Sequence, residues 1–158
     1  MRQLQSKIKG LPWFFIVFCC SFAHAYPKAH LQYDLKFIQD QVLLYKKLTL
    51  DPKIMNPKIF FASEVSLKQF QDAIEPQWGF RPDSITNAYV FANNEIYLLD
   101  DDTYYKQNHR CMDDSLAHEW THFLQLKYQK FDMNDESLEW DAIDLQNWFR
   151  ENFCNLEN

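Results

Sequence analysis

Hydrophobic residues recur three or four positions apart in two segments of the first half of the chain. In residues 30–48 this spacing predicts an amphipathic helix that ends before Pro52. After Ser66 it predicts a second helix, since Ser66 and Gln69 have the spacing of a capping box. Pro76 is expected to stop that helix, because proline lacks the N–H that a helix interior needs.

Short runs rich in β-branched and aromatic residues predict strands. Residues 58–62 form one such run. Residues 88–92 and 95–99 form two more, and the pair Asn93-Asn94 between them predicts a β-hairpin, because asparagine tolerates the positive φ of a tight turn. Together with the predicted helices, these strands predict a small domain of the α+β class.

Two further helices are predicted after the polar stretch that follows the hairpin. Asp113 and Asp114 are candidate N-cap residues for the first of them. On a wheel of about 100° per residue its apolar residues share one sector, which is expected to face the core: Leu116, Ala117, Trp120, Phe123 and Leu124. The last helix is expected to begin at Asn134 or Asp135 and to run toward Cys154.

The first of these two helices carries the pattern H-E-x-x-H at residues 118–122. Positions i and i+4 of a helix differ by about 40°, so His118 and His122 project from one side, with Glu119 about 100° round from His118. Two imidazoles so placed can hold a zinc ion beside a carboxylate that deprotonates water. All three side chains lie outside the apolar sector, which suits the wall of a cleft. Chance alone would produce the pattern in roughly one sequence of this composition in a hundred.

A catalytic zinc site needs a third protein ligand, and acidic residues of the last helix are the candidates. Glu139 has apolar residues on both sides of it on the helical wheel. A carboxylate buried there costs several kcal/mol unless a partner such as zinc compensates it. Glu136 is the other candidate ligand, although an acidic residue in the first turn also suits the helix dipole. Asp141 and Asp144 share the face that is expected to be solvated.

The motif and the glutamate that follows it resemble the gluzincin group of zinc metallopeptidases. Ala142 stands three residues after Glu139, which matches an E-x-x-A variant of the second motif of that group. The resemblance implies that Zn²⁺ is bound by His118, His122 and Glu139. It also implies that Glu119 is the general base.

The same resemblance implies a zincin-like fold in which an edge strand lines the substrate cleft. The hairpin of residues 88–99 is placed to supply that strand. Sixteen residues separate His122 from Glu139, somewhat fewer than in the better-known gluzincins. No His or Tyr follows Glu139 in the sequence, where many members of the group place a residue that stabilises the oxyanion. Candidates to replace it stand in the preceding polar stretch: Tyr104, Tyr105, His109 and Arg110.

The N-terminus has the features of a secretory signal peptide. Three basic residues precede an apolar run over residues 11–22, and an A-x-A cleavage pattern follows at residues 23–25. The run is shorter than the roughly 20 residues of a membrane-spanning helix. We therefore expect residues 1–25 to be removed and residues 26–158 to form one exported domain, periplasmic or secreted, with no stable membrane insertion.

Charge restricts the partners that the exported domain could have. The whole chain has a formal net charge of −6, and the first 25 residues hold three basic and no acidic residues, so the remaining 133 carry −9. A surface of this sign repels phosphate backbones and anionic membranes. We expect a peptide or protein partner and no nucleic acid.

Two cysteines, Cys111 and Cys154, follow the expected cleavage point. In an oxidising exported compartment an even pair predicts a disulfide, which here would join the start of the histidine helix to the end of the glutamate helix. The alternative is that Cys111, seven residues before His118, is a fourth ligand that closes a structural zinc site.

These features predict a small exported protein of minimal zincin-like architecture that hydrolyses peptide bonds, with Zn²⁺ as cofactor and Glu119 as general base. The alternative is a catalytically silent zinc-bearing protein that binds a peptide or protein partner in the same cleft. Glu119 favours the enzyme, because a purely structural site does not need it. The missing oxyanion donor favours the silent protein.

Overall fold

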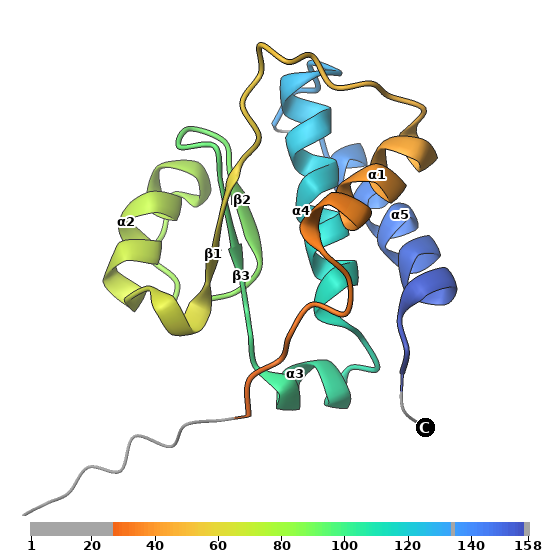
Figure 1. The fold of residues 1–158 in the computed structure, drawn as a ribbon. Coiled ribbons are helices and arrows are strands. Elements are labelled where there is room, and N and C mark those ends of the chain that lie inside the picture. The colour runs from red at the N-terminus through yellow and green to blue at the C-terminus, as the bar shows by residue number, and fades with distance from the viewer. Residues whose placement is uncertain (1–26, 134, 157–158) are drawn as a thin grey trace, which may run out of the picture.

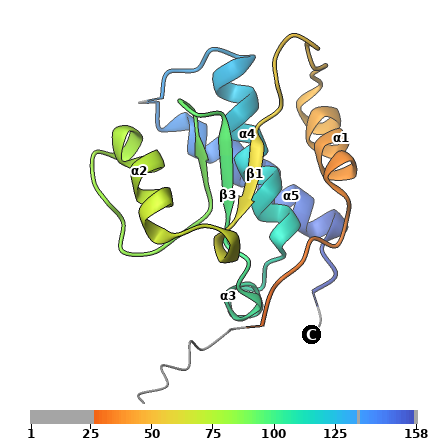
Figure 2. The ribbon, with the colours of Figure 1, turned by 60° about the vertical axis from the view of Figure 1, so that its left-hand side comes forward.

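A small sheet lies between two helices in the computed structural model, which describes residues 27–133 and 135–156 (Figure 1). Helix α2 (Leu67–Trp78) covers one face of the sheet, and helix α4 (Met112–Lys127) covers the other. Helices α5 (Ser137–Phe153) and α1 (Leu35–Lys46) pack against α4, as Figure 2 shows from a second side. The predicted signal peptide, residues 1–25, lies outside the described residues.

The sheet is mixed, with the strand order β1-β3-β2. Strand β1 (Lys58–Phe61) runs parallel to β3 (Glu95–Leu98), and β2 (Ala88–Val90) runs antiparallel to β3. Strand β2 is therefore an edge strand, and it lies beside α4. Helices packed on a small mixed sheet confirm the predicted α+β class.

Alternating side chains of the strands build two cores, one on each face of the sheet. Tyr89, Ile96 and Leu98 pack with the apolar residues of α4, α1 and α5. Ala88, Val90 and Tyr97 face the opposite way and pack with Phe70 and Ile74 of α2. The sheet is thus buried on both faces, and this packing fixes the position of the edge strand β2 beside α4.

Helix boundaries differ from the prediction where a cap overrides the hydrophobic spacing. Helix α1 begins at Leu35 and not at residue 30, because the side chain of Asp34 accepts a hydrogen bond from the N–H of Phe37. Helix α2 begins after Ser66 as predicted but continues through Pro76 to Trp78. It ends where Gly79 adopts φ 75°, a left-handed conformation that costs glycine little.

The hairpin is present, but its connection is longer than predicted. Residues 91–94 join β2 to β3, and of the two asparagines only Asn94 has a positive φ, of 53°. The side chain of Asn94 accepts a hydrogen bond from the hydroxyl of Tyr89 and donates one to the carbonyl of Met55. These contacts stabilise the left-handed residue, which a two-residue turn would have placed differently.

A short helix, α3 (Asp102–Gln107), occupies part of the stretch that the polar pattern left without a predicted element. Asp101 caps it by accepting hydrogen bonds from the N–H groups of Thr103 and Tyr104. The helix places Tyr105 in the core, where its hydroxyl donates to the carbonyl of Leu99. Its caps and its single buried residue form too short a pattern for periodicity to detect.

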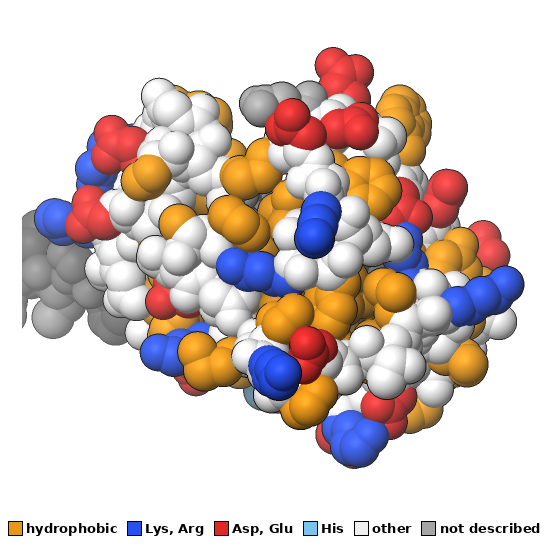
Figure 3. Space-filling view, turned by 90° about the horizontal axis from the view of Figure 1, so that it is seen from above, with side chains coloured by type: hydrophobic (Ala, Val, Ile, Leu, Met, Phe, Trp, Pro, Cys, Tyr) orange, Lys and Arg blue, Asp and Glu red, His pale blue; other side chains and the backbone are white. Residues whose placement is uncertain are grey.

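Charged groups of both signs are interspersed with hydrophobic side chains on the face of the molecule seen from above (Figure 3). Within the described part of the chain, every helix is too short or too polar to cross a membrane.

Candidate metal centre

Two helices bring three potential metal ligands together. Helix α4 contributes His118 and His122, and the first turn of α5 contributes Glu139. The two Nε2 atoms lie 3.0 Å apart. The Glu139 carboxylate oxygens lie 3.5 Å from the Nε2 of His118 and 3.4 Å from the Nε2 of His122. All three side chains thus direct a ligand atom toward one point.

The spacing of these atoms fits a zinc ion. Ligands that bind zinc tetrahedrally at roughly 2.0–2.1 Å are roughly 3.3 Å from one another. The three observed separations, 3.0, 3.4 and 3.5 Å, lie close to that value. Three protein ligands also leave the fourth tetrahedral position open, which is the pattern of catalytic and not of structural zinc sites.

The third position belongs to Glu139 and not to Glu136. Glu136 is the N-cap of α5, and among the described residues it is absent from the cluster of converging ligand atoms. Glu139 was predicted because its apolar neighbours on the helical wheel suggested a buried carboxylate, and this reason was wrong. Its side chain is 62% exposed, because it lies at the end of α5 beyond the apolar contact with α4. The carboxylate is therefore held by the histidines at the mouth of a cleft, and not by burial.

Hydrogen bonds around His122 indicate that its Nδ1 carries a proton. The side-chain amide nitrogen of Gln125 donates to the carbonyl of Leu138 and to a carboxylate oxygen of Asp141, both of which can only accept. The amide oxygen of Gln125 therefore faces the Nδ1 of His122, 2.9 Å away, and accepts a hydrogen bond from it. With its proton on Nδ1, neutral His122 carries a lone pair on Nε2, the atom that faces Glu139.

This hydrogen-bond network extends to a third helix. Asp141 also accepts from Lys46 of α1, whose side chain is buried. Successive hydrogen bonds thus connect the candidate ligand His122 on α4 through Gln125 to Asp141 on α5 and Lys46 on α1. Asp141 was predicted to lie on a solvated face, and the structure corrects this, because its carboxylate is bound on both sides.

His118 differs from His122 on the side away from the cluster. Its Nδ1 is buried, and no hydrogen-bond partner lies near it among the described residues. Burial lowers the pKa of His118, but the hydrogen bond to Glu139 and the charges of Glu119 and Glu139 outweigh this and raise it. The hydrogen bond with His118 in turn lowers the pKa of Glu139. A positive charge is thus favoured at the point where the three side chains meet, which is what a cation site requires.

Glu119 lies in the same cleft but is not one of the converging ligands. It is 5% exposed, and its burial raises the pKa of its carboxyl group. The two histidines and the backbone N–H of Tyr89 in β2 oppose that rise. Glu119 therefore lies between the histidine pair and the edge strand.

The cleft has a volume of about 350 Å³ and is bounded by α4, α5, the edge strand β2 and the end of α2. The hairpin therefore contributes one wall, as the resemblance to the gluzincins implies. The end of α2 was missed by sequence reasoning, because nothing in its spacing points to a cleft. The residues that line the cleft beside the cluster and Glu119 are Gln77, Trp78, Asn87, Ala88, Tyr89, Leu126, Met133 and Leu138.

The four candidate oxyanion donors of the preceding stretch do not reach this cleft. Tyr105, His109 and Arg110 line a different cavity, near the start of α4. The hydroxyl of Tyr105 is committed to the carbonyl of Leu99, and the guanidinium of Arg110 to Asp114. Tyr104 packs its ring against Tyr105 and is absent from the lining of the cleft. This set of candidates was wrong, because α3 turns it toward the far end of α4.

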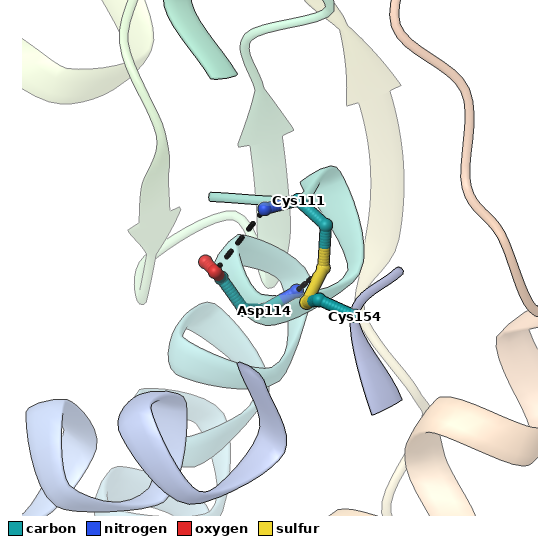
Figure 4. A group of neighbouring side chains, drawn as sticks. All are labelled: Cys111, Asp114 and Cys154. Carbon is teal, nitrogen blue, oxygen red and sulfur yellow. Dashed lines mark hydrogen bonds between the residues drawn. A yellow bond between two sulfur atoms is a disulfide. The ribbon is translucent and has the colours of Figure 1, made fainter. Parts of the chain in front are cut away.

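The predicted disulfide joins Cys111 and Cys154, with their Cα atoms 5.8 Å apart (Figure 4). Cys111 is also the N-cap of α4, and it forms a capping box with Asp114. The predicted N-cap position at Asp113 or Asp114 was therefore two or three residues too late. The alternative role of Cys111 as a zinc ligand is excluded in this structure, because its sulfur is bonded to Cys154 at the start of the helix.

The two aspartates of the first turn of α4 serve other contacts. Asp113 is buried and accepts hydrogen bonds from the backbone N–H groups of Gln32 and Tyr33. Asp114 is also buried and accepts from Arg110 and Arg150. The disulfide and these contacts hold the start of α4 against both ends of the described chain, and they keep the two ligand-bearing helices in register.

Comparison of the chain with models of protein families, with curated proteins and with solved structures finds no significant match. The function therefore has to be inferred from the geometry of this site.

Proposed function

We propose that the protein is a zinc-dependent peptidase that is exported. The observation that carries the proposal is the convergence of His118, His122 and Glu139 at zinc-ligand spacing, beside a buried glutamate that the metal does not need. A site that served structure alone has no use for such a glutamate.

A zinc ion held by the three side chains would act as a Lewis acid that polarises a carbonyl group and acidifies water. Glu119 is placed to accept a proton from the attacking water and to pass it to the leaving amine. The edge strand β2 borders the same cleft, and the backbone at Asn87, immediately before β2, would pair with a peptide substrate. Gln125 keeps His122 in the tautomer that presents its Nε2 lone pair.

Metal content tests the ligand set. The purified mature protein should hold one zinc per chain, and His118→Ala, His122→Ala and Glu139→Ala should each lose it. Asp144→Ala is the matched control, because Asp144 is an exposed carboxylate one turn further along the same helix. Loss of zinc from Glu136→Ala with retention in Glu139→Ala would show that the wrong carboxylate is assigned.

Turnover tests the enzyme. Glu119→Gln keeps the size and a hydrogen-bonding group but removes the base, so the variant should fold and bind zinc while losing turnover by about 10²–10⁴-fold. The assay is digestion of a diverse peptide library, read by mass spectrometry. Cleavage by the zinc-loaded wild type that persists unchanged in Glu119→Gln would contradict the proposed role of Glu119.

A silent zinc-bearing binder is the second candidate, and one observation favours it. No arginine, lysine or third histidine is among the described residues that line the cleft, so a cationic side-chain donor for an oxyanion is missing there. Such a donor is worth roughly 3–4 kcal/mol of barrier. The silent binder would be supported over the enzyme if the fully zinc-loaded protein cleaves no member of the library but, when immobilised on a column, still retains peptides from it.

A further inference from the structure

The outer edge of β2 is already hydrogen-bonded beside the candidate site. In an antiparallel pair, alternate residues turn their backbone groups away from the partner strand. Tyr89 is such a residue, and Phe91 is the first residue of the connection that follows β2; both are bonded to the side chain of Gln77 from α2. The amide nitrogen of Gln77 donates to the carbonyl of Tyr89 at 3.0 Å, and its amide oxygen accepts from the N–H of Phe91 at 3.0 Å.

This pair of bonds imitates the backbone of a neighbouring strand. A residue of a peptide added in parallel would donate its N–H to one residue of the edge and accept from the residue two positions further on. The amide group of Gln77 makes both contacts with one side chain. The remaining outward group of Tyr89, its N–H, is hydrogen-bonded to the carboxylate of Glu119. From Tyr89 to Phe91 the edge therefore has no backbone group left for a ligand.

Beyond Phe91 the strand edge ends, because the chain turns toward β3 and the carbonyl of Phe91 accepts a hydrogen bond from the N–H of Asn94. The ammonium group of Lys127 lies 4.0 Å from the centre of the Phe91 ring and 3.5 Å from its carbonyl oxygen. On the other side of Tyr89, toward the start of β2, the backbone is not covered in this way. Asn87 lines the cleft, and among the described residues no side chain bonds to its backbone N–H or carbonyl. The edge is thus closed on the Phe91 side of the site and accessible on the Asn87 side.

We propose that Gln77 limits strand pairing in the cleft, so that the protein takes peptides close to a chain end and not the middle of an extended chain. The proposal rests on the peptidase function proposed above and names its substrate class. A peptide pairs with β2 on the Asn87 side of Tyr89 and has to end, or leave the edge, at Tyr89. Gln77 does not contact the three candidate metal-ligand side chains. In this scheme it determines which peptides can bind and takes no part in the reaction itself.

Hydrogen exchange tests the closed edge without any substrate. In Gln77→Leu the N–H of Phe91 loses its acceptor, and we expect its exchange to accelerate at least tenfold, measured by NMR on zinc-loaded protein. Gln71→Leu is the matched control, because it removes one side-chain bond to a backbone carbonyl, at Pro82, from the same helix. Unchanged exchange at Phe91 in Gln77→Leu, or equal acceleration in Gln71→Leu, would overturn the proposal.

A second variant keeps the test valid if Gln77→Leu does not fold. Gln77→Glu retains an acceptor for Phe91 but cannot donate to the carbonyl of Tyr89. Slow exchange at Phe91 is therefore expected to persist in this variant. Acceleration there would show that Gln77 does not protect Phe91 in the manner proposed.

Peptide binding tests the consequence separately from catalysis. The probes are capped Val-Thr peptides of two, four and six residues, added to zinc-loaded Glu119→Gln protein. With Gln77 present, affinity should level off between two and four residues, and the Phe91 amide resonance should not shift. With Gln77→Leu added, affinity should rise about tenfold from two to six residues, and the Phe91 resonance should move.

The outcomes separate this proposal from the proposed function. Equal growth of affinity with length in both proteins, or no binding of any peptide by either, overturns the role of Gln77. Absence of cleavage by the zinc-loaded wild type overturns the peptidase while the binding test keeps its meaning. In an active enzyme, the library cleavages should lie near chain ends and should spread inward in Gln77→Leu but not in Gln71→Leu.

Discussion

Gln125 offers a sharp test of the hydrogen bonds that support the candidate metal centre. It is completely buried, and it bonds to the Nδ1 of His122, the carbonyl of Leu138 and the carboxylate of Asp141. Gln125→Leu keeps the approximate size and removes all three bonds. The variant should weaken zinc binding, because the Nδ1 proton of His122 then has no acceptor to orient the ring.

Two magnitudes follow from these contacts. Loss of a bond that orients a ligating histidine weakens metal affinity by about 10–100-fold, which is about 1.4–2.8 kcal/mol. The fold also loses stability, because the Nδ1–H of His122 is left without an acceptor at a cost of about 1–3 kcal/mol, whereas the carbonyl of Leu138 keeps its partner within α5 and Asp141 keeps Lys46. The free energy of unfolding should therefore fall by about 1–3 kcal/mol.

Gln146→Leu is the matched control for this variant. Gln146 is a second buried glutamine, and it bonds to the carbonyl and the carboxylate of Asp114 at the other end of α4. Its loss should destabilise the fold by about 1–3 kcal/mol without changing zinc affinity. Asp114 keeps Arg110 and Arg150 as partners in this control.

The assay is competition for zinc with a chromophoric chelator, together with urea unfolding to fix the folded fraction of each variant. The reasoning is refuted if Gln125→Leu binds zinc as tightly as the wild type after correction for that fraction. It is also refuted if Gln146→Leu weakens zinc binding to the same extent, because the effect would then come from general loosening of the α4–α5 pair.

The remaining predictions concern metal, disulfide, N-terminal contacts and export. Zinc present at a hundredfold excess over its dissociation constant should raise the free energy of unfolding by about 2.7 kcal/mol, and a chelator should remove this gain from the wild type but change nothing in His118→Ala. The disulfide spans a sequence separation of 43, and its reduction should lower the free energy of unfolding, measured in urea, by about 4 kcal/mol. Two free thiols in unreduced, denatured protein would contradict the presence of the disulfide. Asp113→Ala should cost about 1–3 kcal/mol by leaving backbone N–H groups of the N-terminal segment without an acceptor, and an unchanged urea midpoint would refute this. N-terminal sequencing of the exported protein should begin at Tyr26, and mature protein that begins at Met1 would remove the argument for export.

Local geometry allowed several features to be predicted. A helix repeats within a few residues, so the spacing of His118 and His122 was enough to place both imidazoles on one side of α4. Ser66 identified the start of α2 in the same way, because a cap acts on residues only two or three positions away. The hairpin was predicted from the local pattern of its strands and turn residues. The disulfide was predicted because only two cysteines follow the expected cleavage point.

Features that depend on contacts between distant segments could not be predicted in this way. The wheel of the last helix suggested Glu139 for a wrong reason, since burial depends on where α5 crosses α4 and not on which residues flank Glu139. Gln77 gives no sign in the sequence that its amide will cap β2. The candidate oxyanion donors failed because α3 turns them away from the cleft. Spacing along a helix determines the direction of a side chain relative to its own axis, whereas packing between helices and strands determines what that side chain meets.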